Sequence, residues 1–463
     1  MTERTTIRRS VSTGSGGKAG KFRAATGRLW RDREFGKLWA GQTVSLFGTQ
    51  ITLLALPLAA VSLGASAFEM GALRAAQWLP FLLLALPAGL WVERWRKQPV
   101  LVLSNLGQAA LFSLVPLLAF VEVLGVGHLV AVAFAAGACA LFFELAYHSY
   151  LPRLVRREDL VEANGKLMAS MSVSEVGGPG LGGALVGLLT APFALLFDAL
   201  SFLFAAAALW RIKRPEPDPP PRQQAEGGTG GAARELLEGF RATWGNRYLL
   251  AFAGEAATYN VFWSMMEAVL LLWAVKELGL TAGMLGLLLA VGSCGAVLGA
   301  ALTKSAARNF GAGSTMIGSA IVSNVGTLLI PLAPALVAAL APGRGASLAV
   351  AAALGTALFL RGVGMTGCNV QVYAARQAIT PDYLMGRVNA VYTVISRGFV
   401  PVGALMGGVL GEAIGLRPAL VVGASGLFFS WAWLFFSPAR SLRDPSSLTP
   451  AGTAGVREDA VDR

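Results

Sequence analysis

Long apolar stretches recur along almost the whole of this sequence, and they restrict the fold more than any other feature. Each has about 20 residues, the length that a helix needs to cross the hydrocarbon core of a bilayer. Only 14% of the 463 residues are charged, against about 25% in a soluble protein. We therefore expect an all-α, polytopic membrane protein with twelve transmembrane helices. The expected spans lie near residues 36–62, 68–92, 99–121, 126–148, 166–189, 191–211, 248–273, 282–303, 312–333, 346–372, 388–412 and 416–437.

One long polar insert at 212–247 divides the spans into two sets of six. Its proline-rich and glycine-rich segments are typical of a linker, and residues 233–244 have the pattern of a short amphipathic helix. The expected domains are therefore six-helix bundles at 30–211 and 248–438, separated by this linker. Residues 1–29 are polar and basic and are expected to form a disordered cytoplasmic tail, and residues 439–463 to form a second cytoplasmic tail.

The Lys and Arg residues concentrate in alternate loops, which predicts the orientation. Nearly all of the 38 basic residues lie on one side, which the positive-inside rule assigns to the cytoplasm. Both termini are then cytoplasmic, and the protein is a multi-pass protein of the plasma membrane, in contact with its lipid. The exceptions are Lys276, Arg344 and Arg417 in loops on the other side, and Arg74, Arg361 and Arg397 inside spans. This distribution accounts for the net charge of +12 without a nucleic-acid partner, since no basic surface is interleaved with aromatic residues.

The residues that carry metal, cofactor or enzyme chemistry are scarce. The three cysteines lie in apolar segments without a CxxC pair, and the chain has two histidines. A disulfide framework, a metal site or a cofactor is therefore not expected. The HExxH, GxSxG and Walker patterns are also missing, so a membrane enzyme or sensor is the least favoured class.

A segment rich in glycine, residues 177–187, lies in the fifth predicted span. Its glycines are spaced four apart, which lets helix backbones approach closely, and its proline favours a hinge. A related pattern recurs in the eleventh span, with a small difference in spacing after the proline. Repeated halves with interrupted helices at corresponding positions are typical of transporters, whose binding site lies between the repeats. The expected hinge residues are Gly178, Pro179, Gly182, Gly183, Pro401, Gly407 and Gly408.

Three sets of residues resemble the major facilitator superfamily over about 30–440. The loop at 89–97 resembles the superfamily's cytoplasmic loop motif, with Glu93 in place of the usual Asp. Residues 178–183 resemble the fifth-span motif of proton-coupled exporters. Residues 151–155, 163–164 and 198–202 resemble the macrolide-efflux and enterobactin-exporter branch. In that branch an acid often follows the glycine of the first span, where this chain has Thr49.

The resemblance implies two pseudo-symmetric six-helix bundles around a central cavity, in a protein that works as a monomer. Gly89 would let the second and eleventh spans meet at their cytoplasmic ends. Glu93 and Arg94 would latch the halves, with Glu144 in the same gate network beside Arg94 or Arg153. The alternative is a solvated basic loop that only sets the topology.

Ionisable residues inside spans are costly, so each is a candidate for proton coupling or for an ion pair. Glu175 is the preferred coupling carboxylate, because closure of the halves could take it out of water and favour its protonated form. The alternative is a fixed ion pair between Glu175 and Arg361. Asp198 is equally consistent with a structural role, and Arg397 could pair with Glu255. The coupling or ion-pair candidates are Glu175, Arg361, Asp198, Arg74, Glu255 and Arg397.

Polar and aromatic residues within the spans are candidates for the cavity wall. Some of them could instead form ordinary hydrogen bonds between helices. The candidates are Gln42, Gln50, Gln77, Tyr259, Asn260, Phe262 and Trp263. The favoured function is a proton-driven exporter of an amphipathic small molecule such as a drug, macrolide or siderophore. The alternative, which Thr49 favours, is a facilitator-type carrier of a metabolite or lysolipid without proton antiport.

Overall fold

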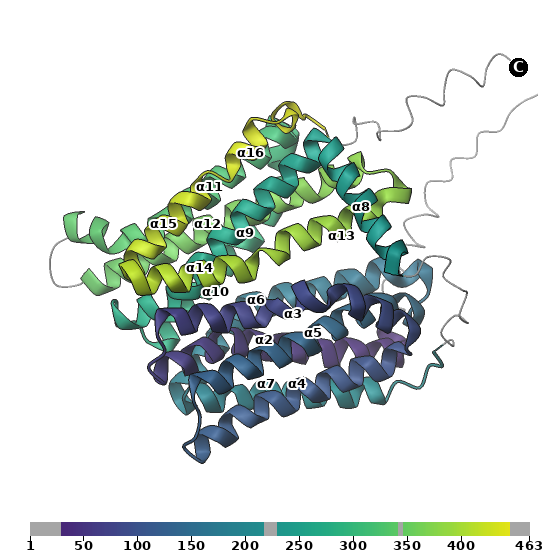
Figure 1. Cartoon of the computed structure of the whole chain (residues 1–463), viewed down its shortest axis with the longest axis horizontal. Coiled ribbons are helices and arrows are strands. Elements are labelled where there is room, and N and C mark those ends of the chain that lie inside the picture. The colour runs from purple at the N-terminus through teal and green to yellow at the C-terminus, as the bar shows by residue number, and fades with distance from the viewer. Residues whose placement is uncertain (1–28, 217–228, 341–345, 445–463) are drawn as a thin grey trace, which may run out of the picture.

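The computed structural model describes residues 29–216, 229–340 and 346–444, and throughout these ranges the regular elements are helices (Figure 1). The expected tail residues 1–28 and 445–463 lie outside them. The first half contains η1 (Leu29–Arg31), α2 (Arg33–Ser62), α3 (Ala67–Arg94), α4 (Lys97–Phe120), α5 (Val126–Leu154), η2 (Arg157–Asp159), α6 (Leu160–Leu189) and α7 (Ala191–Trp210). The second contains α8 (Thr229–Gly245), α9 (Arg247–Lys276), α10 (Ala282–Phe310), α11 (Ala312–Leu340), α12 (Ala346–Ile379), α13 (Asp382–Gly398), α14 (Val400–Ile414), α15 (Leu416–Phe428), α16 (Trp431–Phe435) and η3 (Pro438–Ser441).

The predicted all-α membrane fold is confirmed, since each of the twelve predicted spans falls on a helix or a helix pair. Ten helices of the described chain are long and apolar enough to cross a membrane, and a bent α3 makes eleven. The segments of α3 before and after Leu86 meet at 64°. The twelfth is α6, which has 30 residues and is more polar because it carries charged residues such as Glu162, Lys166 and Glu175.

Local sequence explains where several helices begin and end. Ser66 and Glu69 form a capping box at the start of α3, each side chain bonding to the other residue's backbone N–H. Asn246 is the N-cap of α9, and its side-chain oxygen accepts from the backbone N–H groups of Tyr248 and Leu249. The eleventh span is divided at Phe399, just before Pro401 of α14, and the twelfth divides between α15 and α16. By contrast, α6 is one continuous helix despite Pro179.

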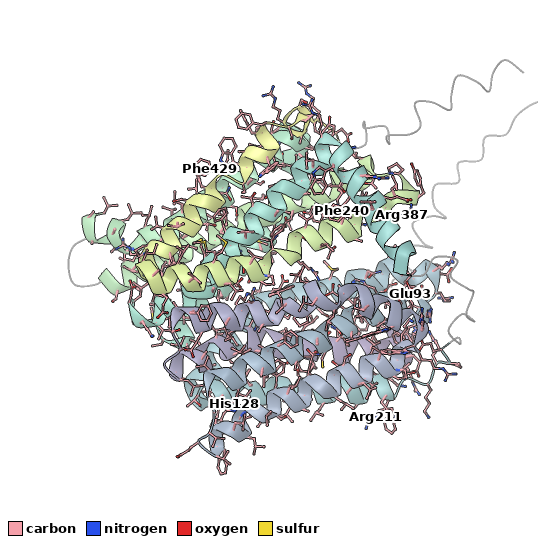
Figure 2. All side chains as sticks on the ribbon, in the orientation of Figure 1. Glu93, His128, Arg211, Phe240, Arg387 and Phe429 are labelled. Atoms are coloured by element: carbon pink, nitrogen blue, oxygen red, sulfur yellow. The ribbon has the colours of Figure 1, made fainter. Side chains whose placement is uncertain are left out.

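The two halves lie side by side, with α3 and α6 of the first facing α10, α13 and α14 of the second (Figure 1). We call the end where α2 begins, α3 ends and α8 lies the linker end, and the opposite end the loop end. In Figure 2 Glu93, Arg211 and Arg387 mark the linker end, and His128 the loop end.

The hydrophobic core is continuous across the halves at one end only. At the loop end, a single cluster contains residues of both halves, among them Leu54 and Leu73 of the first and Trp273 and Leu285 of the second. At the linker end the core divides into one cluster from the first half and separate clusters from the second. The halves are therefore joined by apolar packing at the loop end.

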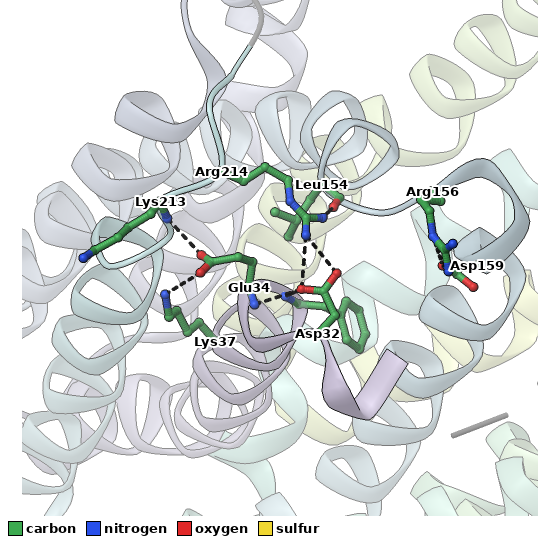
Figure 3. A network of polar contacts seen from close by, with 9 residues as sticks. Asp32, Glu34, Lys37, Leu154, Arg156, Asp159, Lys213 and Arg214 are labelled. Carbon is green, nitrogen blue, oxygen red and sulfur yellow. Dashed lines mark hydrogen bonds and ion pairs between the residues drawn. The ribbon is translucent and has the colours of Figure 1, made fainter. Parts of the chain in front are cut away.

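The linker is attached to both halves. Its start is held on the first half, where Arg214 donates to Asp32 at 3.0 Å and to the Leu154 carbonyl (Figure 3). Beside it, the Lys213 backbone N–H donates to Glu34 at 2.9 Å. Further along, α8 packs on α13 of the second half. There Glu238 pairs with Arg387 at 2.6 Å.

Candidate functional site

Two close glycine contacts join the halves near the loop end. A Cβ atom built on Gly286 of α10 would overlap the Pro179 carbonyl oxygen of α6 and lie 3.1 Å from the Gly183 Cα. On the other side of the interface, a Cβ on Gly71 of α3 would lie 2.9 Å from the Gly408 Cα of α14. These backbones can approach so closely because neither partner carries a side chain.

The two contacts are related by the internal repeat. Gly182 of α6 faces α2 in its own half, where its Cβ would lie 3.2 Å from the Ile51 Cα. Likewise, Gly407 of α14 faces α9 in its own half, against the backbone of Met265. In each half, the first glycine of the pair contacts its own half and the second contacts the other half. The alignment of Gly182-Gly183 with Gly407-Gly408 therefore has a structural basis.

Polar contacts add to the closure of the loop end. The Lys276 ammonium donates to the Ala65 carbonyl at 3.2 Å, from the end of α9 to the turn before α3. The Phe68 backbone N–H lies 3.4 Å from a carboxylate oxygen of Glu412 in α14.

A cavity of about 820 Å³ lies between the halves. Most of its wall comes from α9, α11, α12 and α13, and the first half contributes Arg74, Trp78 and Met171. Of the residues expected in the cavity, it is lined by Tyr259, Asn260 and Trp263. It is also lined by the charged candidates Arg74, Glu255 and Arg397.

Four expected wall residues lie elsewhere in this conformation. Gln42 and Gln50 of α2 do not line this cavity, and Gln50 packs against Gly178. Gln77 accepts a hydrogen bond from Arg74 at 3.0 Å. The Phe262 ring packs against Gly426 of α15, within the second half. Helix packing within each half accounts for these differences, because it decides which side of a helix faces the other half.

Two ion pairs connect the halves through the interface. Arg74 of α3 pairs with Glu267 of α9 at 2.6 Å, and Arg397 of α13 pairs with Glu144 of α5 at 2.8 Å. The sequence suggested that Arg397 could pair with Glu255. In the structure it pairs with Glu144 instead. Its guanidinium extends across the interface toward α3, within 5.9 Å of the Trp78 ring centre.

The expected gate network at the linker end is not assembled in this conformation. Glu144 contacts neither Arg94 nor Arg153, and Arg153 instead pairs with Glu216 at 3.2 Å. No described residue lies within 4 Å of a Cβ built on Gly89. Glu93 and Arg94 are exposed, and neither has an ion pair within the described ranges. The latch role of these residues therefore stays a prediction for another conformation.

Arg361 is not paired with Glu175. Its guanidinium lies over the Trp263 ring at 3.3 Å from the ring centre, a cation–π contact between α12 and α9. Glu175 is half-buried on α6 and is not one of the residues that line the cavity, although Met171, one turn before it, is. Its carboxylate has no hydrogen bond or ion pair with any other part of the described chain. Its coupling role stays a prediction.

Asp198 of α7 is completely buried within the first half. Its carboxyl receives hydrogen bonds from Thr52 of α2 at 2.5 Å and from Ser201 at 2.9 Å. Gly48 makes room for this group, because a Cβ there would overlap both Asp198 and Ser201. No cation of the described chain pairs with it.

Two charged cavity residues, Glu267 and Arg376, were not among the predicted site residues. Arg376 lies on the wall with 7% of its surface exposed, and its guanidinium is 3.8 Å from the Tyr392 ring centre. The predicted span stopped at residue 372, whereas α12 continues to Ile379. Arg376 would have been included if the predicted helix had been extended beyond the end of the apolar stretch. Within the described ranges, no three His, Cys, Asp or Glu side chains gather in a metal-binding group.

The comparisons with known proteins agree with this architecture. The family model of the Major Facilitator Superfamily matches residues 38–402. The multidrug efflux pump Tap of Mycolicibacterium fortuitum is 25% identical over 395 residues, covering 82% of this chain and 92% of the pump. Macrolide efflux protein A of Streptococcus pyogenes is 24% identical over 183 residues, covering 40% of this chain and 45% of that protein.

Solved transporter structures share the fold. A bacterial homologue of the iron transporter ferroportin, in an inward-facing state, superposes with a TM-score of 0.68 at 16% identity, covering 87% of this chain and 98% of that one. The nucleoside transporter NupG gives a TM-score of 0.65 at 12% identity, covering 87% and 99%.

Proposed function

We propose that this chain, which belongs to the Major Facilitator Superfamily, exports an amphipathic small molecule by alternating access and proton antiport. Its family makes it a membrane transporter of small molecules and not an enzyme. The direction of transport and the substrate class are proposed from the relatives, a multidrug pump and a macrolide efflux protein. A drug, macrolide or siderophore-like compound fits this proposal.

The observation that carries the proposal is the one-ended junction of the halves. The hydrophobic core crosses the interface at the loop end and is split at the linker end. A cavity lined by both halves lies between them. Two rigid bundles joined in this way can rock about the cavity and expose it to each side in turn.

The orientation is part of the proposal. The distribution of Lys and Arg assigns the linker end and both termini to the cytoplasm. The conformation described is then inward-facing, ready to receive a substrate from the cytoplasm. We also propose that the monomer is the working unit in its lipid bilayer, because one chain supplies both sides of the cavity.

Glu175 supports the proton-coupling part of the proposal. It lies on α6 one turn before Pro179, whose carbonyl contacts α10 of the other half. Its half-buried carboxylate has no partner in the described chain, so its surroundings would change when α6 moves against α10. Asp198, by contrast, is held by two hydroxyl groups inside one half and fits a structural role.

Accumulation of a fluorescent macrolide in cells tests the function. The parent protein should keep accumulation low, and an uncoupler should raise it. The variant E175Q should export without a response to the uncoupler, or fail to export. The control is E162Q on the same helix, whose carboxylate pairs with Lys166 at 2.5 Å and should not matter for coupling. If E175Q matches the parent in both conditions, Glu175 is not the coupling group.

The facilitator-type carrier of a metabolite or lysolipid is the second candidate, because Thr49 stands where the related branch often has an acid. Proteoliposomes separate the two. An antiporter moves protons when substrate is added to one side, whereas a facilitator moves substrate down its gradient with no proton flux.

A further inference from the structure

Glu255 is a buried acid on the cavity wall. Its side chain lies on α9, two turns from the linker end, and the residue is 7% exposed. Within the described ranges its carboxylate has no hydrogen bond and no ion pair. A buried carboxylate without a partner is costly, so such a group usually belongs to a site that something else completes.

Arg376 is a buried base on the same wall. It lies on α12, is also 7% exposed, and has no ion pair within the described chain. Its Nε has no hydrogen-bond partner in the described part of the chain, and its guanidinium is stacked on Tyr392 of α13. Stacking leaves the edge of a guanidinium free to donate to a carboxylate or phosphate.

The other charged groups on this wall are already paired. Arg74 is paired with Glu267, and Arg397 is paired with Glu144. Glu255 and Arg376 are therefore the charged wall residues that lack an ion pair in the part of the chain that the structure describes. The two are farther apart than an ion pair allows, since no such pair forms between them.

An aromatic surface continues the site away from these charges. Tyr259 and Trp263 follow Glu255 at spacings of four and eight residues, so they lie above it on the same face of α9. The Tyr259 hydroxyl is buried and has no hydrogen-bond partner of good geometry among the described residues. The wall therefore offers one acid, one base and an aromatic surface, on which Arg361 lies over the Trp263 ring at 3.3 Å from its centre.

We propose that this wall is a binding site for a zwitterion, with its amine at Glu255, its carboxylate at Arg376 and its apolar body against Tyr259 and Trp263. The inference rests on the proposed function, because it names the substrate class of the same cavity. A purely cationic ligand would leave Arg376 unpaired, and a purely anionic one would leave Glu255 unpaired.

Three probes with the same indole ring test the site in the purified full-length protein. Tryptophan carries an amine and a carboxylate, tryptamine only the amine, and indole-3-propionate only the carboxylate. Binding is measured by equilibrium dialysis at up to millimolar concentration. Tryptophan should bind at least about tenfold more tightly than either single-charge probe, because each removes one charge-assisted hydrogen-bonded contact.

Two variants assign the contacts. E255Q should abolish the preference for tryptophan over indole-3-propionate and keep that over tryptamine. R376Q should do the reverse, and R376K should restore part of the lost preference. The controls E122Q and R308Q change exposed residues outside the cavity and should leave all three affinities unchanged. Size-exclusion profiles show which variants are folded.

The assignment is overturned if none of the probes binds, if a single-charge probe binds as tightly as tryptophan, or if both folded variants keep the parent's preferences. It is also overturned if E255Q removes only the response of transport to an uncoupler, since Glu255 would then carry a proton and not a substrate amine. Macrolide accumulation in cells separates the two proposals. A parent that exports the macrolide but shows no zwitterion preference keeps the proposed function and loses this inference.

Discussion

Gly183 of α6 and Gly286 of α10 touch backbone to backbone across the two halves of the transporter. A Cβ on Gly286 would lie 3.1 Å from the Gly183 Cα, and one on Gly183 would lie 2.5 Å from the Ala282 carbonyl oxygen. The repeat places Gly71 and Gly408 in the same relationship on the opposite side of the interface. Closure of the loop end therefore depends on missing side chains at two symmetry-related places.

Substituting Gly183 by alanine should favour the conformation in which the loop end is open. The added methyl group cannot fit without moving backbone, and such overpacking costs about 1–3 kcal/mol. A cost in this range shifts the ratio of the two conformations by about 5- to 150-fold. Export should fall, because a carrier biased to one state completes its cycle slowly.

The measurement is the labelling rate of a cysteine introduced at Ser396 on the cavity wall, with a membrane-impermeant maleimide added from outside. G183A should raise that rate. G187A on the same helix is the control, because no residue that the structure describes lies within 4 Å of its Cβ position. Equal rates in the two variants would show that the glycine contact does not hold the loop end closed.

The ion pair between Arg74 and Glu267 should stabilise the conformation described here. Both side chains face the cavity, with 19% and 33% of their surfaces exposed, so we expect a coupling energy of about 1 kcal/mol. R74Q and E267Q should each increase outside labelling at Ser396, and the double variant should add little to either. A double-mutant cycle gives the coupling energy. Additive single effects would mean that the pair makes no contribution.

The stack of Arg361 on Trp263 should contribute to stability more than an exposed stack does. Removing the indole ring in W263L should lower the free energy of unfolding of the purified protein by about 2 kcal/mol, because the Arg361 guanidinium is half-buried and its Nε has no hydrogen-bond partner in the described chain. W263F should retain part of the stabilisation, because it keeps an aromatic ring under the guanidinium. The comparison is W30L, because Lys166 lies 4.3 Å from the centre of the Trp30 ring and Trp30 is 53% exposed. W30L should lower the free energy of unfolding by about 0.5 kcal/mol.

The sequence predicted the spans and the repeat because both depend on local patterns. Bilayer thickness fixes the length of an apolar stretch, and paired glycines mark close helix contacts, as Gly182-Gly183 and Gly407-Gly408 illustrate. The partners of the charged residues could not be predicted in this way. Arg397 reaches Glu144 in the other half, so its partner depends on how the halves are docked and not on the helix that carries it.

Cavity residues were predictable only in part for the same reason. A polar residue within a span indicates that something polar is nearby, but the rotation of the helix decides whether it faces the cavity or a neighbour. Tyr259 and Asn260 of α9 line the cavity, whereas Phe262, two residues later, packs on Gly426 within its own half. Arg376 was not predicted to line the cavity because the apolar stretch ends before the helix α12 does.

Variants of Asp198 test whether this carboxyl group has a structural role or couples protons to transport. It is completely buried, and its two oxygens accept hydrogen bonds from Thr52 and Ser201 without a cation in the described chain. D198N keeps the size of the group and can still hydrogen-bond both hydroxyls. We therefore expect D198N to match the parent in thermal stability and in its response to an uncoupler. D198A should lose about 1–3 kcal/mol, since it leaves the buried Thr52 hydroxyl unpaired beside a newly created cavity, while Ser201 keeps its hydrogen bond to the carbonyl of residue 198. Thermal unfolding of the purified variants and macrolide accumulation in cells check both statements. A stable D198N protein that no longer responds to an uncoupler would transfer the coupling role from Glu175 on α6 to this carboxyl between α2 and α7.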